Sequence, residues 1–496
     1  MTRRQGFVSG VIAAAAAVAV SEALAAVINL RESPVLALGQ TVIKLTPGGV
    51  AEGIIGVVGT NDKPLAVASV LLAIALLGGL AGNWWTRRRP WSIALICLLV
   101  VAASGAVIAR PYAYVGGVVV CVVAGSVVAV VIELLTRATA EPDAGRRTFL
   151  RTTGMVVAAT VVVGGAGELL GSRRRRRQEI ERARAALKLP TRGVAVPSGV
   201  DLGVKDQPPW LTPNDEFYRI DTALSPPLID PYEWELRIHG MVDREMTLTY
   251  QDLLDRGLKD AWITLCCVSN EVGGDLIGNT TWSGVPIKDI LDEVGIKPGA
   301  DALLSTSEDG WTCGTPLAAL TDGRDALLAL TMNGEPLPVP HGFPVRQVVP
   351  GLYGYVSATK WVTDWEVTRF EDFEAYWTQR GWGRLGPVKT EARIDVPRSA
   401  AEAGKVTVAG VAWQQHVGIS GVEVRIDGGS WQPATLAKVP NVDTWVQWTW
   451  QWDADTGDHT IEARATNSAG VPQTHEVADV LPDGATGYPG IRVTIT

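Results

Sequence analysis

Five long apolar segments in the first third of the chain constrain its fold more than any other feature. They run from Phe7 to Leu30, Leu65 to Trp84, Trp91 to Ala109, Val115 to Leu135 and Gly154 to Leu170. Each is close to the roughly 20 residues that an α-helix needs to cross a bilayer. Buried helices of a soluble protein rarely follow one another in such a series. We therefore predict an all-α transmembrane domain of five helices over residues 1–171.

Basic residues predict the orientation of these helices. Arg3-Arg4, Arg87-Arg88-Arg89 and Arg146-Arg147 fall on one side if each segment crosses once, and positive charge favours the cytoplasmic side. Five crossings then place the rest of the chain outside. Five arginines at 173–177 oppose this, and if they stay inside, the rest is cytoplasmic. However, Gly145 to Arg151 resembles a twin-arginine export signal. We predict a multi-pass membrane protein, in contact with lipid, whose large domain is extracytoplasmic.

The remaining residues of this 496-residue chain suffice for two further domains. We expect a short interfacial or re-entrant helix between residues 29 and 64, and a linker at 172–209 with a helix over 178–189. Residues 210–386 predict a mixed α/β (α+β) domain. In it, strands at 234–238 and 261–267 alternate with helices at 250–258 and 287–294.

Residues 387–496 lack helical periodicity and alternate as strands do. The predicted strands are 389–396, 405–413, 422–426, 445–452, 459–465 and 491–496. Glycine turns such as Asp427-Gly428-Gly429 separate several of them. This pattern predicts an immunoglobulin-like β-sandwich.

Composition excludes several classes of function. The net charge of -8 argues against a nucleic acid partner. Five cysteines are too few for a domain held by several disulfides. All five histidines follow the apolar segments, so the helical region cannot hold a haem between two histidines, and no haem is expected.

Two separated motifs carry the chemistry. Cys266-Cys267-Val268-Ser269-Asn270 offers a thiolate, and the Gly- and Pro-rich segment from Met332 to Arg346 offers His341 and Arg346. Thiolates select soft or high-valent metals, whereas a guanidinium can donate two parallel hydrogen bonds to a phosphate. Together they predict a metal carried by a phosphorylated organic cofactor.

At these residues the chain resembles the sulfite oxidase family of molybdopterin enzymes. The matching segments, in the family's order, are Thr264-Leu265-Cys266-Cys267, Gly278-Asn279, Trp282 to Pro286, Met332 to Arg346 and Lys360-Trp361. The resemblance implies a molybdenum-molybdopterin (Mo-MPT) cofactor with one cysteine ligand, cycling between Mo(VI) and Mo(IV). It also implies a C-terminal module that forms a homodimer.

The resemblance assigns the metal ligand to Cys267, because the family cysteine lies two residues after Leu265 and three before Asn270. Cys266 then points to the opposite face of its strand and belongs to the core. Two alternatives stay open: an inert buried thiol at Cys267, or, less favoured without a Cys-x-x-Cys pair, a zinc site with Cys266 and Cys313.

The remaining site residues are also implied by the resemblance. His341, Arg346 and Lys360 correspond to positions that contact the pterin, with Lys360 on an expected strand. Arg219 corresponds to an arginine at the cofactor and substrate pocket. Further candidates for cofactor binding are Asn270, Asn279 and Ser357. Tyr376 either matches a catalytic tyrosine or packs with Trp377 and Trp382.

The substrate is less constrained than the cofactor. Sulfite oxidases carry arginines after the ligand cysteine, whereas this chain has Glu271-Val272-Gly273-Gly274, and a carboxylate there would repel sulfite. We expect oxygen-atom transfer, in either direction, with a small oxyanion or sulfoxide-type substrate. Electrons would pass to an external carrier, a cytochrome c or a quinone-linked protein. The alternative is a non-catalytic envelope binding or assembly protein with a degenerate molybdopterin fold.

Overall fold

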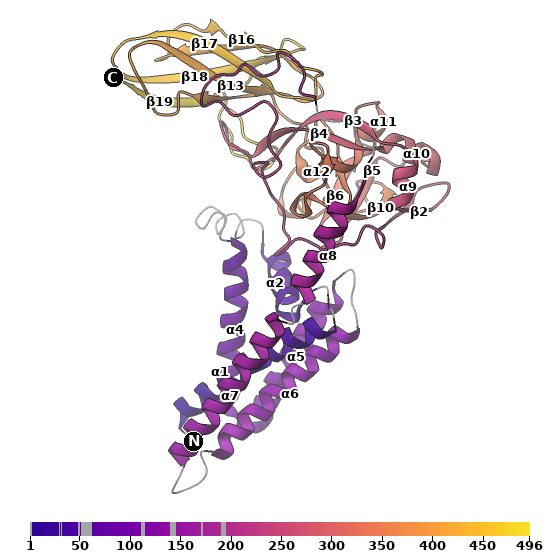
Figure 1. Ribbon diagram of the computed structural model, residues 1–496, viewed down its shortest axis with the longest axis vertical. Coiled ribbons are helices and arrows are strands. Elements are labelled where there is room, and N and C mark those ends of the chain that lie inside the picture. Colours follow the sequence, from indigo (N-terminus) through magenta and orange to yellow (C-terminus); the bar gives the residue numbers. More distant parts are fainter. Residues whose placement is uncertain are drawn as a thin grey trace. The chain divides into compact units, whose positions relative to one another are not determined.

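The chain divides into two compact units. A computed structural model describes residues 2–28, 30, 32–47, 50, 62–110, 115–138, 145–169, 172–189 and 195–496. The first unit comprises Met1–Arg182 and Thr222–Leu228, and the second comprises Ala183–Asp221 and Ile229–Thr496. The first is helical and the second carries the β-sheets (Figure 1).

The first unit contains the predicted apolar helices. Its elements are α1 (Arg3–Val27), α2 (Pro34–Leu45), α4 (Asp62–Trp84), α5 (Arg89–Ile108), α6 (Val115–Ala138), α7 (Gly145–Leu169) and most of α8 (Ser172–Ala186). Five of these helices are long and apolar enough to cross a membrane. The short apolar helix α2 lies where an interfacial helix was expected, although much of the surrounding 29–64 segment lies outside the described residues. The linker helix α8 begins earlier than the predicted 178.

Glycines allow α1 and α4 to pack with their backbones in contact. A Cβ atom at Gly10 would lie 2.0 Å from the carbonyl oxygen of Gly78, and one at Gly82 would lie 2.2 Å from that of Gly6. Small residues four positions apart are typical of helix pairs that associate in lipid, where close van der Waals packing replaces the hydrophobic effect. Helix α1 also packs against α6 and α7.

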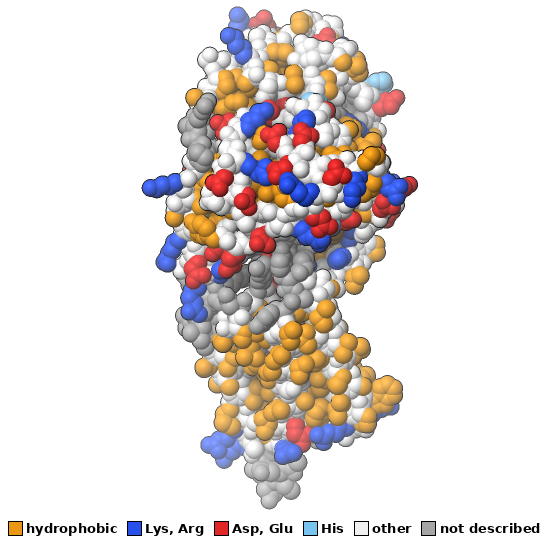
Figure 2. Space-filling view, turned by 90° about the vertical axis from the view of Figure 1, so that its right-hand side faces the viewer, with side chains coloured by type: hydrophobic (Ala, Val, Ile, Leu, Met, Phe, Trp, Pro, Cys, Tyr) orange, Lys and Arg blue, Asp and Glu red, His pale blue; other side chains and the backbone are white. Residues whose placement is uncertain are grey.

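A polar cluster closes one end of the helical unit. Glu133 of α6 accepts hydrogen bonds from Trp85 Nε1 at 2.8 Å, from Arg89 at 3.2 Å and from Arg137 at 2.8 Å. Figure 2 shows Lys and Arg side chains gathered at the lower end of this unit, below an apolar surface. An apolar band that ends in basic groups suits a helix bundle at a membrane interface.

The central part of the second unit contains two sheets and short helices. One sheet has the order β2-β1-β10-β5-β6 and the other β3-β4-β7-β8, with β9 paired to β7. The strands are β1 (Glu235–Gly240), β2 (Met246–Thr249), β3 (Lys259–Cys266), β4 (Ile277–Pro286), β5 (Ala302–Ser307), β6 (Thr312–Pro316), β7 (Leu327–Met332), β8 (Glu335–Pro336), β9 (Arg346–Val348) and β10 (Val362–Thr368). The helices are α9 (Tyr250–Asp255), α10 (Ile287–Val294), α11 (Leu317–Thr321), α12 (Gly354–Ser357) and the 3-10 turns η2 (Val339–His341) and η3 (Thr378–Arg380).

This arrangement confirms the predicted mixture of strands and helices and corrects two details. Helix α9 stops at Asp255 rather than Leu258, because Gly257 adopts φ +79° and turns the chain. Lys360 precedes β10 and forms an isolated bridge with Arg346 instead of lying within a strand.

The C-terminal part of the second unit is β-rich. One sheet has the order β11-β13-β17-β16 and the other β12-β19-β18-β14-β15. The strands are β11 (Glu391–Val396), β12 (Ala400–Ala401), β13 (Gly404–Trp413), β14 (Ile419–Ile426), β15 (Gln432–Pro433), β16 (Thr435–Leu436), β17 (Val446–Ala454), β18 (Gly457–Asn467) and β19 (Gly490–Ile495). Both sheets contribute to one core that includes Val408, Val424, Trp448 and Ile461. The six predicted strands are present, and three two-residue strands were not predicted. The immunoglobulin type stays a prediction.

The glycine contact between α1 and α4 can be tested by one substitution at two positions. Alanine normally stabilises a helix by about 1 kcal/mol relative to glycine. Gly105 of α5 has no atom within 4 Å of an added Cβ, so Gly105→Ala should preserve or raise the melting temperature of the detergent-solubilised protein. Gly10→Ala should lower it, because overpacking costs about 1–3 kcal/mol. Equal melting temperatures for the two variants would contradict this packing.

Candidate functional site

Cys267 lies in the turn at the end of β3. This strand pairs with β4 in antiparallel register as far as Cys266 and Ile277. The amide of Cys267 then donates to Leu276 O at 2.9 Å, and the amide of Asn270 donates to Cys267 O at 3.1 Å. Both cysteines are buried, with exposures of 0% for Cys266 and 8% for Cys267. A strand end therefore presents two neighbouring thiols.

The two thiols have different surroundings. Burial raises the pKa of Cys267, but hydrogen bonds from the amide and hydroxyl of Ser269 and from the amide of Val268 oppose this effect. Burial raises the pKa of Cys266 well above its usual range, and the carboxyl group of Glu391 raises it further. Donors around a sulfur favour its thiolate form. The turn therefore suits a thiolate ligand at Cys267 better than at Cys266.

A tight turn brings the predicted cationic residues together. Gly342 adopts φ +114°, and a Cβ atom there would lie 2.9 Å from Arg346 Cβ and 3.3 Å from Lys360 Cα. Arg346 in turn donates from Nη1 to His341 O at 3.1 Å. Only glycine accommodates both the backbone conformation and the close approach. As a result His341, Arg346 and Lys360, which are separate in the sequence, become neighbours.

Asp221 joins Arg219 to this group. Its Oδ2 lies 2.8 Å from Arg219 Nε and 2.6 Å from Lys360 Nζ. We call Arg219, Asp221, His341, Arg346 and Lys360 the cationic cluster. The sequence analysis missed Asp221, although in an extended segment residues two apart point the same way, so its spacing from Arg219 was a usable signal.

The cationic cluster is electrostatically strained. Burial, then Arg346, Lys360 and Arg219, lower the pKa of His341 to about 3, so its imidazole is neutral at physiological pH. Burial lowers the pKa of Lys360 to about 8 although Asp221 opposes it. Burial also lowers the pKa of Arg346 to about 10, and its Nε has no hydrogen-bond partner among the described residues. Such surplus positive charge with a free donor suits a bound anion such as a phosphate.

Phe217 and Tyr218 connect the thiol end with the cationic end. The ring of Phe217 stacks on Tyr218 at 5.1 Å and meets His341 edge-on at 5.8 Å. Burial raises the pKa of Tyr218 well above its usual range, Cys267 and Cys266 raise it further, and Arg346 opposes them. The Tyr218 phenol is thus close enough to both ends for their charges to act on it. It is a second residue to which the sequence analysis gave no role.

Three predicted cofactor contacts have partners within the protein. Asn279 accepts from Thr264 at 2.8 Å and donates to Trp210 O at 3.0 Å. Ser357 donates to Tyr353 O at 3.0 Å. Asn270 accepts from the amide of Leu276 at 2.8 Å, while its Nδ2 has no partner in the described part of the chain. Asn279 and Ser357 therefore order the backbone, and Asn270 keeps one donor free.

Tyr376 contacts a different set of residues. The guanidinium of Arg380 lies 3.7 Å from the centre of its ring, and Trp377 lies 5.1 Å away, edge-on. Trp377 in turn meets Trp382 at 6.2 Å. None of these aromatic partners belongs to the cationic cluster or the cysteine turn. These contacts favour the packing alternative for Tyr376.

Arg184, at the end of α8, holds the segment that leads to His341. It donates to Pro336 O and Leu337 O, each at 2.8 Å, and lies 3.7 Å from the carboxylate of Glu335. Nothing in the local sequence indicated this contact, because its partners lie about 150 residues away. Arg184 thereby steadies the start of the loop that carries His341 and Arg346.

The residues present fit a metal carried by an organic cofactor. Within the described ranges no three His, Cys, Asp or Glu side chains lie together as a metal site. A metal at Cys267 would therefore take its other ligands from outside the described residues, as it would from an organic cofactor. The unpartnered Nε of Arg346 and the surplus charge around it suit the phosphate of such a cofactor.

Comparison with known proteins finds relatives of the part of the chain that contains this site. The oxidoreductase molybdopterin binding domain matches residues 223–377. The chain is 32% identical over 179 residues to the uncharacterized oxidoreductase YuiH of Bacillus subtilis, covering 36% of this chain and 87% of that protein. It is 29% identical over 321 residues to the mitochondrial sulfite oxidase of Drosophila melanogaster, covering 52% of this chain and 54% of the relative.

Other similar proteins match a comparable part of the chain. The mitochondrial sulfite oxidase of Homo sapiens is 27% identical over 322 residues, covering 55% of this chain and 56% of that protein. The chain thus spans about half the length of the sulfite oxidases it matches. The sulfane dehydrogenase SoxCD of Paracoccus pantotrophus is similar in structure at a TM-score of 0.48 and 22% identity, covering 54% of this chain and 77% of that one.

The cationic cluster predicts a pH-dependent affinity for anions. In the cofactor-free protein, sulfate should bind less tightly as the pH rises from 7 to 10, because Lys360, with a pKa of about 8, loses its charge while sulfate keeps its own. One lost charge at this range should weaken binding by roughly tenfold. Lys360→Met should bind weakly at pH 7 with a flatter profile, and Lys297→Met, at an exposed position, should match the wild type. Isothermal titration calorimetry would measure both, and a pH-independent wild type would contradict the assignment.

Proposed function

The chain belongs to the sulfite oxidase family of molybdopterin-dependent oxidoreductases, and from this premise we propose a membrane-anchored enzyme that exchanges an oxygen atom with a small substrate. The observation that carries the proposal is one constellation of residues. The cysteine turn, in which donors surround the Cys267 sulfur, and the buried cationic cluster both act on the phenol of Tyr218.

The chain's own residues would hold the cofactor at its two ends. Cys267 would ligate the metal, while Arg346, Lys360 and Arg219 would bind the phosphate. His341 would hold Arg346 in place, because its carbonyl oxygen accepts from Arg346 Nη1. Once bound, the molybdenum-molybdopterin group supplies two-electron oxygen-atom exchange. Asp221 would keep two cations side by side, because its carboxylate contacts both Arg219 and Lys360.

Tyr218 is the phenol best placed to act in the reaction. Its raised pKa keeps the hydroxyl protonated at physiological pH, so it remains a hydrogen-bond donor. A donor beside the reacting oxygen would stabilise negative charge that develops there. Tyr376, to which the family resemblance first pointed, contacts Arg380 and Trp377 instead.

The proposed substrate is a small oxyanion or a sulfoxide-type molecule. Glu271 is exposed in the loop that follows the cysteine turn, and a carboxylate near the metal disfavours a sulfite dianion. The named relatives include sulfite oxidases. Activity should therefore be assayed with sulfite-like molecules, and also with sulfoxide-like molecules, which carry no such charge. Electrons would pass to a cytochrome c or a quinone-linked protein.

The helical unit would anchor the enzyme, with the sheets on the extracytoplasmic side. Five apolar helices of suitable length support the anchor, and Arg3-Arg4, Arg87-Arg88-Arg89 and Arg146-Arg147, which share one side if each helix crosses once, support this orientation. The β-rich C-terminal part, whose two sheets share one core, would be an immunoglobulin-like sandwich that forms a homodimer.

Metal analysis tests the proposed cofactor directly. Purified full-length protein from a molybdenum-replete host should contain about one molybdenum per chain, held through one thiolate. Cys267→Ser should lose most of the metal and all oxidoreductase activity. Cys266→Ser, at the neighbouring buried thiol, should keep the metal. A wild type without molybdenum or pterin would point instead to a binding or assembly protein, and a Cys267→Ser variant with full activity would refute the ligand assignment.

Matched tyrosine variants test the donor. Tyr218→Phe should lower kcat by roughly 10²-fold, the usual effect of removing one donor at a reacting oxygen, with molybdenum content unchanged. Tyr376→Phe should retain activity near the wild type. Turnover of sulfite with an artificial acceptor and of dimethyl sulfoxide with an artificial donor would be measured for both. The reverse ranking of the two variants would assign the phenol to Tyr376.

A further inference from the structure

The strand that carries the cysteines is an edge strand of its sheet, and the C-terminal part of the chain covers that edge. Strand β3 is first in the order β3-β4-β7-β8, so its outer edge offers unpaired amide and carbonyl groups. The amide of Thr264 donates to Asp443 O at 2.9 Å, and Gln415 Nε2 donates to Thr264 O at 3.1 Å. Asn441 Nδ2 likewise donates to Trp262 O at 3.1 Å.

The side chain of Thr264 connects the covering C-terminal segment to strand β4. Its hydroxyl accepts from the amide of Trp445 at 2.8 Å and donates to Asn279 Oδ1 at 2.8 Å. Thr264 is 1% exposed, so water cannot replace either partner. Cys267 follows three residues later, at about 3.3 Å per residue along the strand. Any slip or twist of β3 at Thr264 therefore moves the sulfur.

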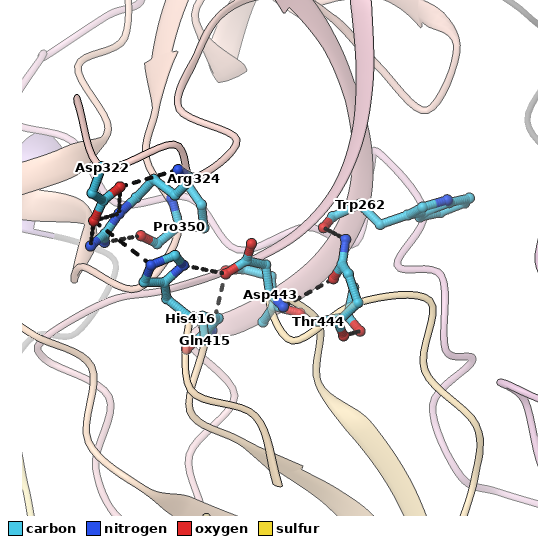
Figure 3. A network of polar contacts seen from close by, with 10 residues as sticks. Trp262, Asp322, Arg324, Pro350, Gln415, His416, Asp443 and Thr444 are labelled. Carbon is cyan, nitrogen blue, oxygen red and sulfur yellow. Dashed lines mark hydrogen bonds and ion pairs between the residues drawn. The ribbon is translucent and has the colours of Figure 1, made fainter. Parts of the chain in front are cut away.

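A second layer of contacts holds the covering segments in place. The ring of His416, next to Gln415, lies 3.7 Å from Asp322 and 3.5 Å from Asp443. Arg324 binds Asp322 at 2.6 Å and Pro350 O at 2.8 Å. These residues come from loops of the central part and of the C-terminal part of the second unit, and they point toward one another (Figure 3). The covering segments are thereby fixed to the part of the chain that contains the proposed site.

We infer that the β-rich C-terminal part completes the site, with Gln415, Asp443 and Trp445 as positioning residues that hold β3 and set the place of the Cys267 sulfur. This inference rests on the proposed function. A metal ligand must be held within about 0.5 Å of its working geometry. An edge strand paired on one side only would not provide this. The hydrogen bonds from Gln415, Asp443 and Trp445 take the place of a second neighbouring strand beside β3.

The test compares substitutions that remove one hydrogen bond each with matched controls. Gln415→Met removes the donor to Thr264 O, and Gln451→Met makes the same change in an exposed pair with Thr407 of the same β-rich part. Thr264→Val removes the hydroxyl, and Thr264→Ser restores it. Full-length, molybdenum-loaded protein would be examined by electron paramagnetic resonance of the Mo(V) state, by the rate of molybdenum loss on dialysis and by melting temperature.

Gln415→Met and Thr264→Val should shift the g values and lose molybdenum roughly fivefold faster, as expected for one lost hydrogen bond. Gln451→Met and Thr264→Ser should match the wild type. Wild-type g values and retention in Gln415→Met, even with a lowered melting temperature, would overturn the inference and leave the proposed function intact. A wild type without molybdenum would overturn the proposed function and this inference with it.

Discussion

The buried positive charge of the cationic cluster is the constraint on which the second unit depends. Taking a cation out of water costs several kcal/mol unless partners compensate it, and Arg346 and Lys360 are both nearly enclosed. Asp221 compensates Lys360 directly, and the face of Trp282 supports Arg346 at 4.9 Å. Among the described residues, no carboxylate forms an ion pair with Arg346, and its Nε has no hydrogen-bond partner. The buried cations therefore repel one another, and a bound anion would relieve this repulsion.

The same constraint explains several local features that otherwise look unrelated. Gly342 is needed because Arg346 and Lys360 both approach its Cα so closely that a Cβ atom there would collide with them. Arg184 holds the start of that loop from the linker helix. Phe217 fills the space between His341 and Trp282, with centroid distances of 5.8 Å and 6.0 Å. Each feature limits the movement of charged groups that repel one another.

The sequence predicts most helices and strands but few of the side-chain contacts between distant segments. Alternation and apolar length identify the strands and long helices because these signals are local. Cys267, His341 and Arg346 stand out because each lies in a distinctive motif. Arg184 does not, since its partners lie about 150 residues away. Asp221 has a near partner in Arg219, but its second partner, Lys360, lies 139 residues away. Tyr376 shows a further limit, because an aromatic-rich segment is compatible with both a catalytic tyrosine and a packing cluster, and only its contacts with Trp377 favour packing.

The cover of strand β3 has a consequence for how the protein is made. Gln415 and Trp445 follow Thr264 by 151 and 181 residues. During translation the cysteine strand therefore emerges long before its outer neighbour exists. A chain that stops before Trp445 lacks the completed edge. The cysteine strand and the residues that cover it must therefore both be made before the proposed ligand turn has its full set of hydrogen bonds.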